Sequence, residues 1–182
     1  DFLKKTESLK ANFVHKQVLS SGRVIKFEGK IFFRRPDRLK WLVEKPYSQL
    51  QLLRGKEFLL YDPDLEQVTI QSLDESLDAT PAGLLFASGP KAEDRLKKRY
   101  NLFVAPSKDN ISWVLAIPKN PSEEGFNIEI GLNKKGFIVE ILTTDVFKRS
   151  SRISFTNLRQ NTVIDDAVFI PVIPSGVEYI EQ

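Results

Sequence analysis

The 182-residue chain contains no cysteine, no methionine and a single histidine, His15. Without cysteine it has no disulfide framework, zinc finger, iron–sulfur ligand or thiol nucleophile. The sequence does not indicate the redox compartment, because a cysteine-free chain is compatible with both the cytosol and the periplasm. No carboxylate stands near His15 at the spacing of a catalytic triad or a metal site. We therefore expect His15 to be a strand residue that faces solvent or a polar edge.

Other functional motifs are missing as well. The chain has no G-x-S-x-G nucleophile elbow, no calcium loop and no glycine loop for phosphate. It has 27 Lys and Arg against 24 Asp and Glu, and the resulting net charge of +3 is too small to indicate general binding of nucleic acid. The sequence therefore predicts a protein that is not an enzyme, with no catalytic residue, cofactor, metal or nucleic-acid partner.

Long hydrophobic runs are also absent, since none approaches the ~20 residues of a membrane-spanning helix. The chain starts at Asp1 and not at Met, so we expect a soluble protein whose signal peptide has been removed. A composition of 41% hydrophobic and 28% charged residues fits one folded domain over residues 1–182. Bulky apolar residues are plentiful, with 13 Phe, 2 Trp and 4 Tyr.

Most of the sequence alternates apolar and polar residues with period two, which is the pattern of half-buried strands. In residues 25–35 the apolar side chains occupy odd positions, and the same parity returns in residues 39–43 after the turn signal Pro36-Asp37. This pattern predicts two adjacent antiparallel strands with one dry face, which carries Ile25, Phe27, Ile31, Phe33, Leu39, Trp41 and Val43.

Similar short strands are predicted over most of the remaining chain, at 50–53, 58–61, 66–71, 111–118, 126–132, 136–144, 149–158, 167–172 and 177–180. No alternation of strands with long helices occurs, so the sheet of ten or eleven strands should be antiparallel. Helices are predicted only at residues 2–10, 80–87 and 92–100. The dry face must be covered by a second sheet, by closure into a barrel, or by helices.

Arg35 stands out because the register of its strand places a guanidinium at the end of the dry face. A buried charge without partners is costly, so two interpretations stay open. Arg35 either snorkels to water beside Pro36, or it hydrogen-bonds to the segment that covers the sheet.

Several motifs, in the same order along residues 3–180, resemble the LolA family of periplasmic lipoprotein carriers. The most specific are Arg35-Pro36, Trp41 with Pro46, and residues 61–68, Tyr-Asp-Pro-Asp-Leu-Glu-Gln-Val. Weaker matches are residues 9–13, 29–35, 80–85 and 118–119, with Phe169, Pro174 and Gly176-Val177 near the end. Residues 101–110 have no pattern that aligns with the family.

The resemblance implies a mainly β fold, an incomplete antiparallel barrel of about eleven strands with a lid of short helices over an apolar cavity. It assigns the lid latch to Arg35 and the lid helix to Pro81, Leu84, Leu85 and Phe86. Mapped onto the dry faces, the acyl-chain cavity would be lined by Phe27, Ile31, Phe33, Leu39, Trp41, Val43, Leu52 and Phe58.

The same resemblance implies a monomer in the periplasm whose cargo is lipoproteins, held by their acyl chains. Its implied partners are the inner-membrane LolCDE transporter, which loads it, and the outer-membrane receptor LolB, which unloads it. Each acyl CH₂ kept from water is worth ~0.8 kcal/mol, so such a carrier needs a large dry surface. The alternatives are a related half-barrel lipid-binding protein, such as LolB or the RseB sensor domain, and, outside the family, a small all-β enzyme.

Overall fold

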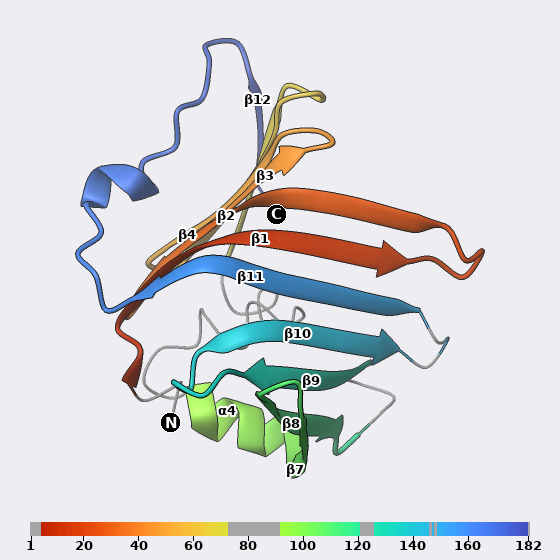
Figure 1. The fold of residues 1–182 in the computed structure, drawn as a ribbon. Helices are drawn as coiled ribbons and strands as arrows, with labels where there is room; N and C mark the ends of the chain where they lie inside the picture. Colours follow the sequence, from red (N-terminus) through yellow and green to blue (C-terminus); the bar gives the residue numbers. More distant parts are fainter. Residues whose placement is uncertain (1–4, 73–91, 121–125, 146, 148, 182) are drawn as a thin grey trace.

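The main feature of the computed structural model is one twelve-stranded sheet (Figure 1). The structure describes residues 5–72, 92–120, 126–145, 147 and 149–181. The strand order is β12-β6-β5-β4-β3-β2-β1-β11-β10-β9-β8-β7. The strands are β1 (Ser8–Val18), β2 (Val24–Arg34), β3 (Arg38–Lys45), β4 (Gln49–Arg54), β5 (Glu57–Asp62), β6 (Gln67–Ser72), β7 (Tyr100–Lys108), β8 (Ile111–Pro118), β9 (Phe126–Leu132), β10 (Ile138–Asp145), β11 (Ser150–Gln160) and β12 (Glu178–Glu181).

The sheet is curved and mixed. In Figure 1, β1, β2, β11 and β10 are seen broadside, whereas β3 and β4 are seen almost edge-on. Every pair of neighbouring strands is antiparallel except β12 and β6, which are parallel. The prediction of a wholly antiparallel sheet is therefore wrong at this pair. β12 reaches its place through the long connection 161–177 and not through a hairpin, so its direction is not set by a tight turn.

The predicted hairpin of β2 and β3 is confirmed. Phe33 pairs with Leu39 and Ile31 pairs with Trp41, on either side of the turn at residues 35–37. The parity that predicted a shared dry face is thus the observed one, since Ile31, Phe33, Leu39 and Trp41 are all buried.

Three local predictions are corrected or refined by the structure. The helix expected at 2–10 is wrong from Ser8 onward, because Leu9, Ala11 and Phe13 alternate as buried residues of β1. The strand expected at 167–172 is instead a 3₁₀ helix, η2 (Asp166–Phe169), which begins where the Asp165 carboxylate accepts the Ala167 N–H. β7 was not predicted, because nearly all of its residues are exposed and so its side chains do not alternate between water and core.

The charged helix expected at 92–100 is confirmed as α4 (Ala92–Arg99), which ends where β7 begins. The predicted helix at 80–87 lies outside the described residues. In the part of the chain that the structure describes, no helix is long and apolar enough to cross a membrane.

Two apolar clusters lie on opposite sides of the sheet. We call the side with the larger cluster the major face; its buried members are Leu9, Ala11, Phe13, Ile31, Phe33, Leu39, Trp41, Val43, Leu53, Leu96, Tyr100, Ala116, Ile128, Ile130, Ile138, Ile141, Ile153 and Phe155. We call the other side the minor face; its buried members are Leu50, Leu52, Leu59, Val68, Ile164 and Phe169. The two sets follow from pleating, which sends successive side chains to opposite faces.

The C-terminal connection 161–177 covers the minor face over β2 to β6. Ile164 and Phe169 complete the minor cluster. The Arg34 Nη1 donates to the Ile164 carbonyl at 2.8 Å, and the Lys40 Nζ donates to the Val168 carbonyl at 3.0 Å. In Figure 1 this connection runs as the blue segment with η2 beside the sheet.

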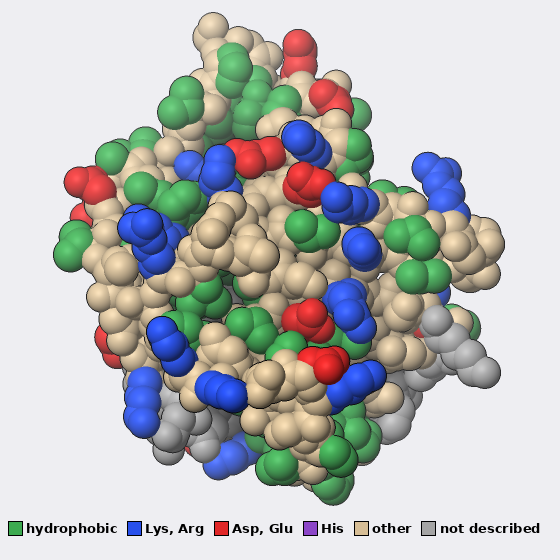
Figure 2. All heavy atoms as spheres, in the orientation of Figure 1, with side chains coloured by type: hydrophobic (Ala, Val, Ile, Leu, Met, Phe, Trp, Pro, Cys, Tyr) green, Lys and Arg blue, Asp and Glu red, His purple; other side chains and the backbone are tan. Residues whose placement is uncertain are grey.

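The charged surface mixes both signs. In the space-filling view of Figure 2, Lys and Arg side chains are interspersed with Asp and Glu. On β2, Lys26 pairs with Glu28 at 2.5 Å and Lys30 pairs with Glu44 of β3 at 2.6 Å. These exposed pairs contribute little stability, and they keep the local charge balanced.

Candidate functional site

The major face is organised around a stack of aromatic rings. The Phe13 and Trp41 rings lie 4.0 Å apart between centroids and 25° from parallel, and the Phe155 ring meets Trp41 edge-on at 6.4 Å. These three residues come from β1, β3 and β11, which are separated in sequence and joined only by the sheet. Aromatic pairs in such geometries gain energy beyond the burial of their area.

Gly29 makes the stack possible. It is the β2 partner of Phe13, and a Cβ atom built on it would lie 2.8 Å from Phe13 Cζ and 1.9 Å from the Leu42 carbonyl oxygen. No larger residue fits there, because one of these clashes is with backbone. The missing side chain leaves room for the Phe13 ring to reach across β2 to Trp41.

Seven of the eight predicted cavity residues meet on the major face. Five of them are buried in its cluster and two pack against it as partly buried residues: Ile31, Phe33, Leu39, Trp41 and Val43, with Phe27 and Phe58. The eighth, Leu52, lies in the minor cluster. β4 is apolar on both faces, so parity alone did not distinguish Leu52 from Leu53, and Leu53 is the one on the major face.

The sequence-based site was limited to the first half of the chain. The structure adds the strands of the second half, with Ile128 and Ile130 on β9, Ile141 on β10 and Ile153 on β11. The signal was present, because these strands show the same period-two alternation. What the sequence did not show was that β1 pairs with β11 and thereby makes the two halves continuous.

His15 lies on the major face, opposite Phe27 of β2. It is a strand residue, as expected, and it is half-buried. Its Nε2 lies 2.6 Å from Ser151 Oγ, and its ring lies 5.6 Å from that of Phe27. Burial lowers the pKa of His15 from 6.5 to about 4, so the imidazole is neutral at neutral pH.

Arg35 follows the last residue of β2 and contacts the N-terminal segment. Its Nε donates to the Thr6 carbonyl at 2.7 Å, and its guanidinium lies over the Phe33 ring, 5.2 Å from the centroid. Burial lowers the pKa of Arg35, opposed by the charge of Glu7. The predicted lid residues Pro81, Leu84, Leu85 and Phe86 lie outside the described residues.

Arg34 makes structural contacts that the sequence reasoning missed. Its guanidinium forms an ion pair with Asp166 and lies 5.4 Å from the Phe169 ring centroid. Its parity sends it to the minor face, opposite to Phe33. The pair Arg34-Arg35 therefore contacts both chain ends, with Arg34 on the C-terminal connection and Arg35 on the N-terminal segment.

The major face is suited to holding apolar groups. It presents side chains without ionised groups across most of its strands, and its one imidazole is neutral. The described residues contain no group of three or more His, Asp or Glu side chains arranged to hold a metal ion. The major face can bind a hydrocarbon by excluding water from it, and the stabilisation is proportional to the apolar area that is covered.

Comparison with known proteins gives one consistent result. A family model described as outer membrane lipoprotein carrier protein LolA matches residues 4–171. The chain is 34% identical over 186 aligned residues to the outer-membrane lipoprotein carrier protein of Bordetella avium, covering 100% of this chain and 84% of that protein. It is 33% identical over 182 residues to the protein of the same description from Nitrosomonas europaea, with coverage of 100% and 86%.

Solved structures share the fold at low identity. A conserved uncharacterised protein from Thermus thermophilus matches with a TM-score of 0.65 and 8% identity, over 100% of this chain and 94% of that one. A LolA superfamily protein from Nitrosomonas europaea matches with a TM-score of 0.52 and 11% identity, over 91% of each chain. The MucA/MucB complex of Pseudomonas aeruginosa contains a chain that matches with a TM-score of 0.57 and 14% identity, and this chain spans only 58% of its length.

Proposed function

The chain belongs to the LolA family of outer-membrane lipoprotein carrier proteins, and from that premise we propose that the acyl chains of a lipoprotein bind on the major face of its sheet. Carriage of lipoproteins is the function of the family, and it is not enzymatic. The proposal concerns where on this molecule the cargo is held.

The observation that carries the proposal is the continuity of the major face. One apolar cluster runs without interruption from β4 across β1 and β11 to β8, with the Phe13–Trp41–Phe155 stack near its middle. Acyl chains need a dry surface of this kind, since each CH₂ kept from water is worth ~0.8 kcal/mol. The minor face is smaller, and the C-terminal connection already occupies it.

We extend the proposal to the cover of this face. Its cluster residues are buried, so acyl chains reach them only when the covering segment moves. The resemblance to the family supports Pro81, Leu84, Leu85 and Phe86 as the lid helix, and Arg35 as the latch, within an incomplete barrel formed by residues 1–182 as one domain. A latch of a few hydrogen bonds, each worth ~0.5 to 1.5 kcal/mol net, could be opened by cargo at modest cost.

Carriers of this family are usually periplasmic, and we propose that location for this chain. We also propose, on the same resemblance, that the chain acts as a monomer. It would receive lipoproteins from the LolCDE transporter and deliver them to the receptor LolB.

The two tryptophans allow a direct test of the binding face. Trp41 lies on the major face. Trp113 pairs with Gly131, and this register places the Trp113 side chain on the opposite face of the sheet. Trp113→Phe leaves Trp41 as the only tryptophan, and Trp41→Phe leaves Trp113. A triacylated lipopeptide brominated in its acyl chains should quench the fluorescence of Trp41 by more than half, because bromine quenches only on near contact.

The Trp41→Phe variant is the matched control. Its remaining Trp113 should keep most of its emission when the same lipopeptide is bound at the same occupancy. Equal quenching of both residues would mean nonspecific coating of the protein. Quenching confined to Trp113 would place the acyl chains on the wrong side of the sheet and contradict the proposal.

A further inference from the structure

Among the described strands, β7 is the edge of the sheet next to β8. Its residues 101–105, Asn-Leu-Phe-Val-Ala, carry no charge. The exposed fractions are 37% for Leu102, 51% for Phe103 and 89% for Val104. Proteins usually protect such edges with charge, proline or a covering element. Here Pro106 and Lys108 protect only the second half of the strand, where the pairing with β8 is also irregular.

At two residues of β7 the backbone N–H and C=O groups point away from β8, toward the free edge of the sheet. The Lys119 N–H donates to the Arg99 carbonyl at 2.9 Å, and Tyr100 lies opposite Pro118. In an antiparallel ladder the hydrogen-bonded pairs alternate, so residues 101 and 103 direct their N–H and C=O groups to β8. Leu102 and Val104 therefore direct theirs to the free edge.

The side chains of the same two residues belong to the major face. Leu102 pairs with Ala116, which is buried in the major cluster, and Val104 pairs with Val114, which packs against it. Paired residues of neighbouring strands lie on the same face. The apolar surface proposed for acyl chains thus continues to an exposed border whose backbone is open to a further strand.

We infer that the free edge of β7 binds an extended segment of the cargo polypeptide, next to its acylated end, as an added β-strand. This inference rests on the proposed function, because the acyl chains on the major face bring the peptide to this border. Addition of a strand to an open edge takes its affinity from main-chain hydrogen bonds and tolerates many sequences. That tolerance suits a carrier whose cargoes share a lipid and differ in polypeptide.

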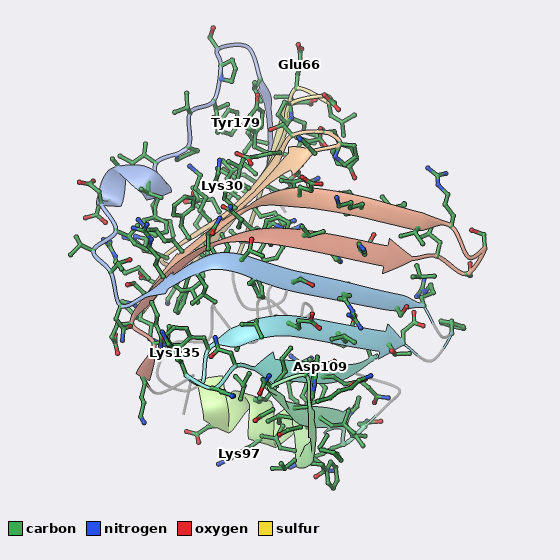
Figure 3. The ribbon with its side chains drawn as sticks, in the orientation of Figure 1. Lys30, Glu66, Lys97, Asp109, Lys135 and Tyr179 are labelled. Carbon is green, nitrogen blue, oxygen red and sulfur yellow. The ribbon has the colours of Figure 1, made fainter. Side chains whose placement is uncertain are left out.

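The charges at the two ends of β7 favour a cargo segment over a second copy of this chain. Figure 3 labels Lys97, on the helix before β7, and Asp109, in the turn after it. Antiparallel pairing of two copies centred on Phe103 would bring the exposed Lys98, in the last turn of α4, to the same end of the pairing as Lys108 of the other copy, and like charges close together repel. Lys97 and Lys98 before the uncharged stretch and Lys108 after it outnumber the acidic Asp109 in the turn, so this edge fits an extended segment that is uncharged in the middle and acidic at its ends.

Val104→Pro is the test variant. Proline at this position removes an N–H that points to the free edge and leaves the β7–β8 bonds intact, which is the setting in which edge strands tolerate proline. Val104→Ala is the matched control, because it shortens the side chain and keeps the N–H. The probes are a triacylated cysteine with an extended six-residue tail and the same triacylated cysteine ending in an amide.

The wild type should bind the tailed probe about tenfold more tightly than the tailless one, the effect of two or three net hydrogen bonds. Val104→Pro should abolish most of that preference and bind the tailless probe as tightly as Val104→Ala does, because both variants lose the valine side chain, whereas Val104→Ala should retain the preference. Hydrogen exchange should slow at the amides of Leu102 and Val104 when the tailed probe binds, and not when the tailless probe binds.

Other outcomes separate the two proposals. If neither probe binds, the acyl-binding function fails, and this inference fails with it. If both probes bind equally and the two amides exchange as before, the added strand is wrong and the acyl-binding face stands. If the two amides are protected without any probe, in step with formation of a dimer in sedimentation, a second copy occupies the edge and the inference is overturned.

Discussion

His15 shows how a titratable residue is kept compatible with an apolar surface. It packs near Phe27 and has one hydrogen-bond partner, Ser151. Because burial lowers its pKa to about 4, it carries no charge at neutral pH, and it does not add the desolvation cost of an ion to the binding of hydrocarbon. Ser151 satisfies the Nε2 atom that would otherwise be buried without a partner.

The lowered pKa predicts a specific loss of stability in acid. The unfolded chain binds a proton at His15 near pH 6.5, whereas the folded protein binds it near pH 4. The contribution of His15 to stability is therefore complete above pH 6.5 and is lost as the pH falls toward 4. Over that range it should lower the free energy of unfolding by at most about 3 kcal/mol.

His15→Gln gives the comparison, because glutamine can replace the Nε2 hydrogen bond and does not titrate. Urea unfolding of both proteins at several pH values between 7 and 4.5 should show a steeper decline for the wild type. Parallel curves would mean that His15 titrates normally in the folded protein.

At the scale of elements, the C-terminal connection is held by β2 and β3. Arg34 donates to the Ile164 carbonyl, pairs with Asp166 and lies over Phe169. Lys40 of β3 donates to the Val168 carbonyl, and burial lowers the pKa of the Lys40 amine. These contacts satisfy two carbonyl groups of a connection that has little regular structure, and they fix Phe169 in the minor cluster.

Arg34→Ala should therefore lower the free energy of unfolding by about 2 kcal/mol, since it removes a charge-assisted bond to a carbonyl together with packing on Phe169. Hydrogen exchange at the amides of Val168 and Ile170, whose acceptors lie within this connection, should become faster. Asp166→Ala is the control. The Asp166 side chain is 76% exposed, so its loss should cost less than about 1 kcal/mol. Equal effects of the two variants would place the stabilisation in the ion pair.

At the scale of the whole molecule, the major cluster joins the two halves of the chain. It contains residues of β1 to β4 and of β7 to β11 together with Leu96 of α4. A ligand on this cluster contacts a surface that exists only when both halves are assembled. It therefore stabilises the folded state of the entire sheet.

A triacylated lipopeptide at 100 times its Kd should raise the free energy of unfolding by about 2.7 kcal/mol. For a chain of this length the midpoint of thermal unfolding should rise by about 5 to 10 °C. The deacylated peptide at the same concentration should leave the midpoint unchanged. A similar rise with the deacylated peptide would show that the polypeptide part, and not the hydrocarbon, supplies the binding energy.

Sequence alone was enough for the features that depend on neighbouring residues. The period-two pattern of β2 and β3 predicted their faces and their pairing, because side chains of consecutive residues alternate in any strand. The lack of cysteine, and of carboxylates near the one histidine, excluded most catalytic and metal chemistry. The specific motifs around Arg35, Trp41 and residues 61–68 identified the family before the fold was known.

Only the tertiary structure decided the features that join distant residues. It placed Leu52 on the minor face and Leu53 on the major one. It also set β12 parallel to β6, and it left His15 half-buried beside Phe27. The physical reason is common to all three. Burial and strand order depend on what packs from elsewhere in the chain, and alternation along one strand distinguishes its two faces without showing what will cover either of them.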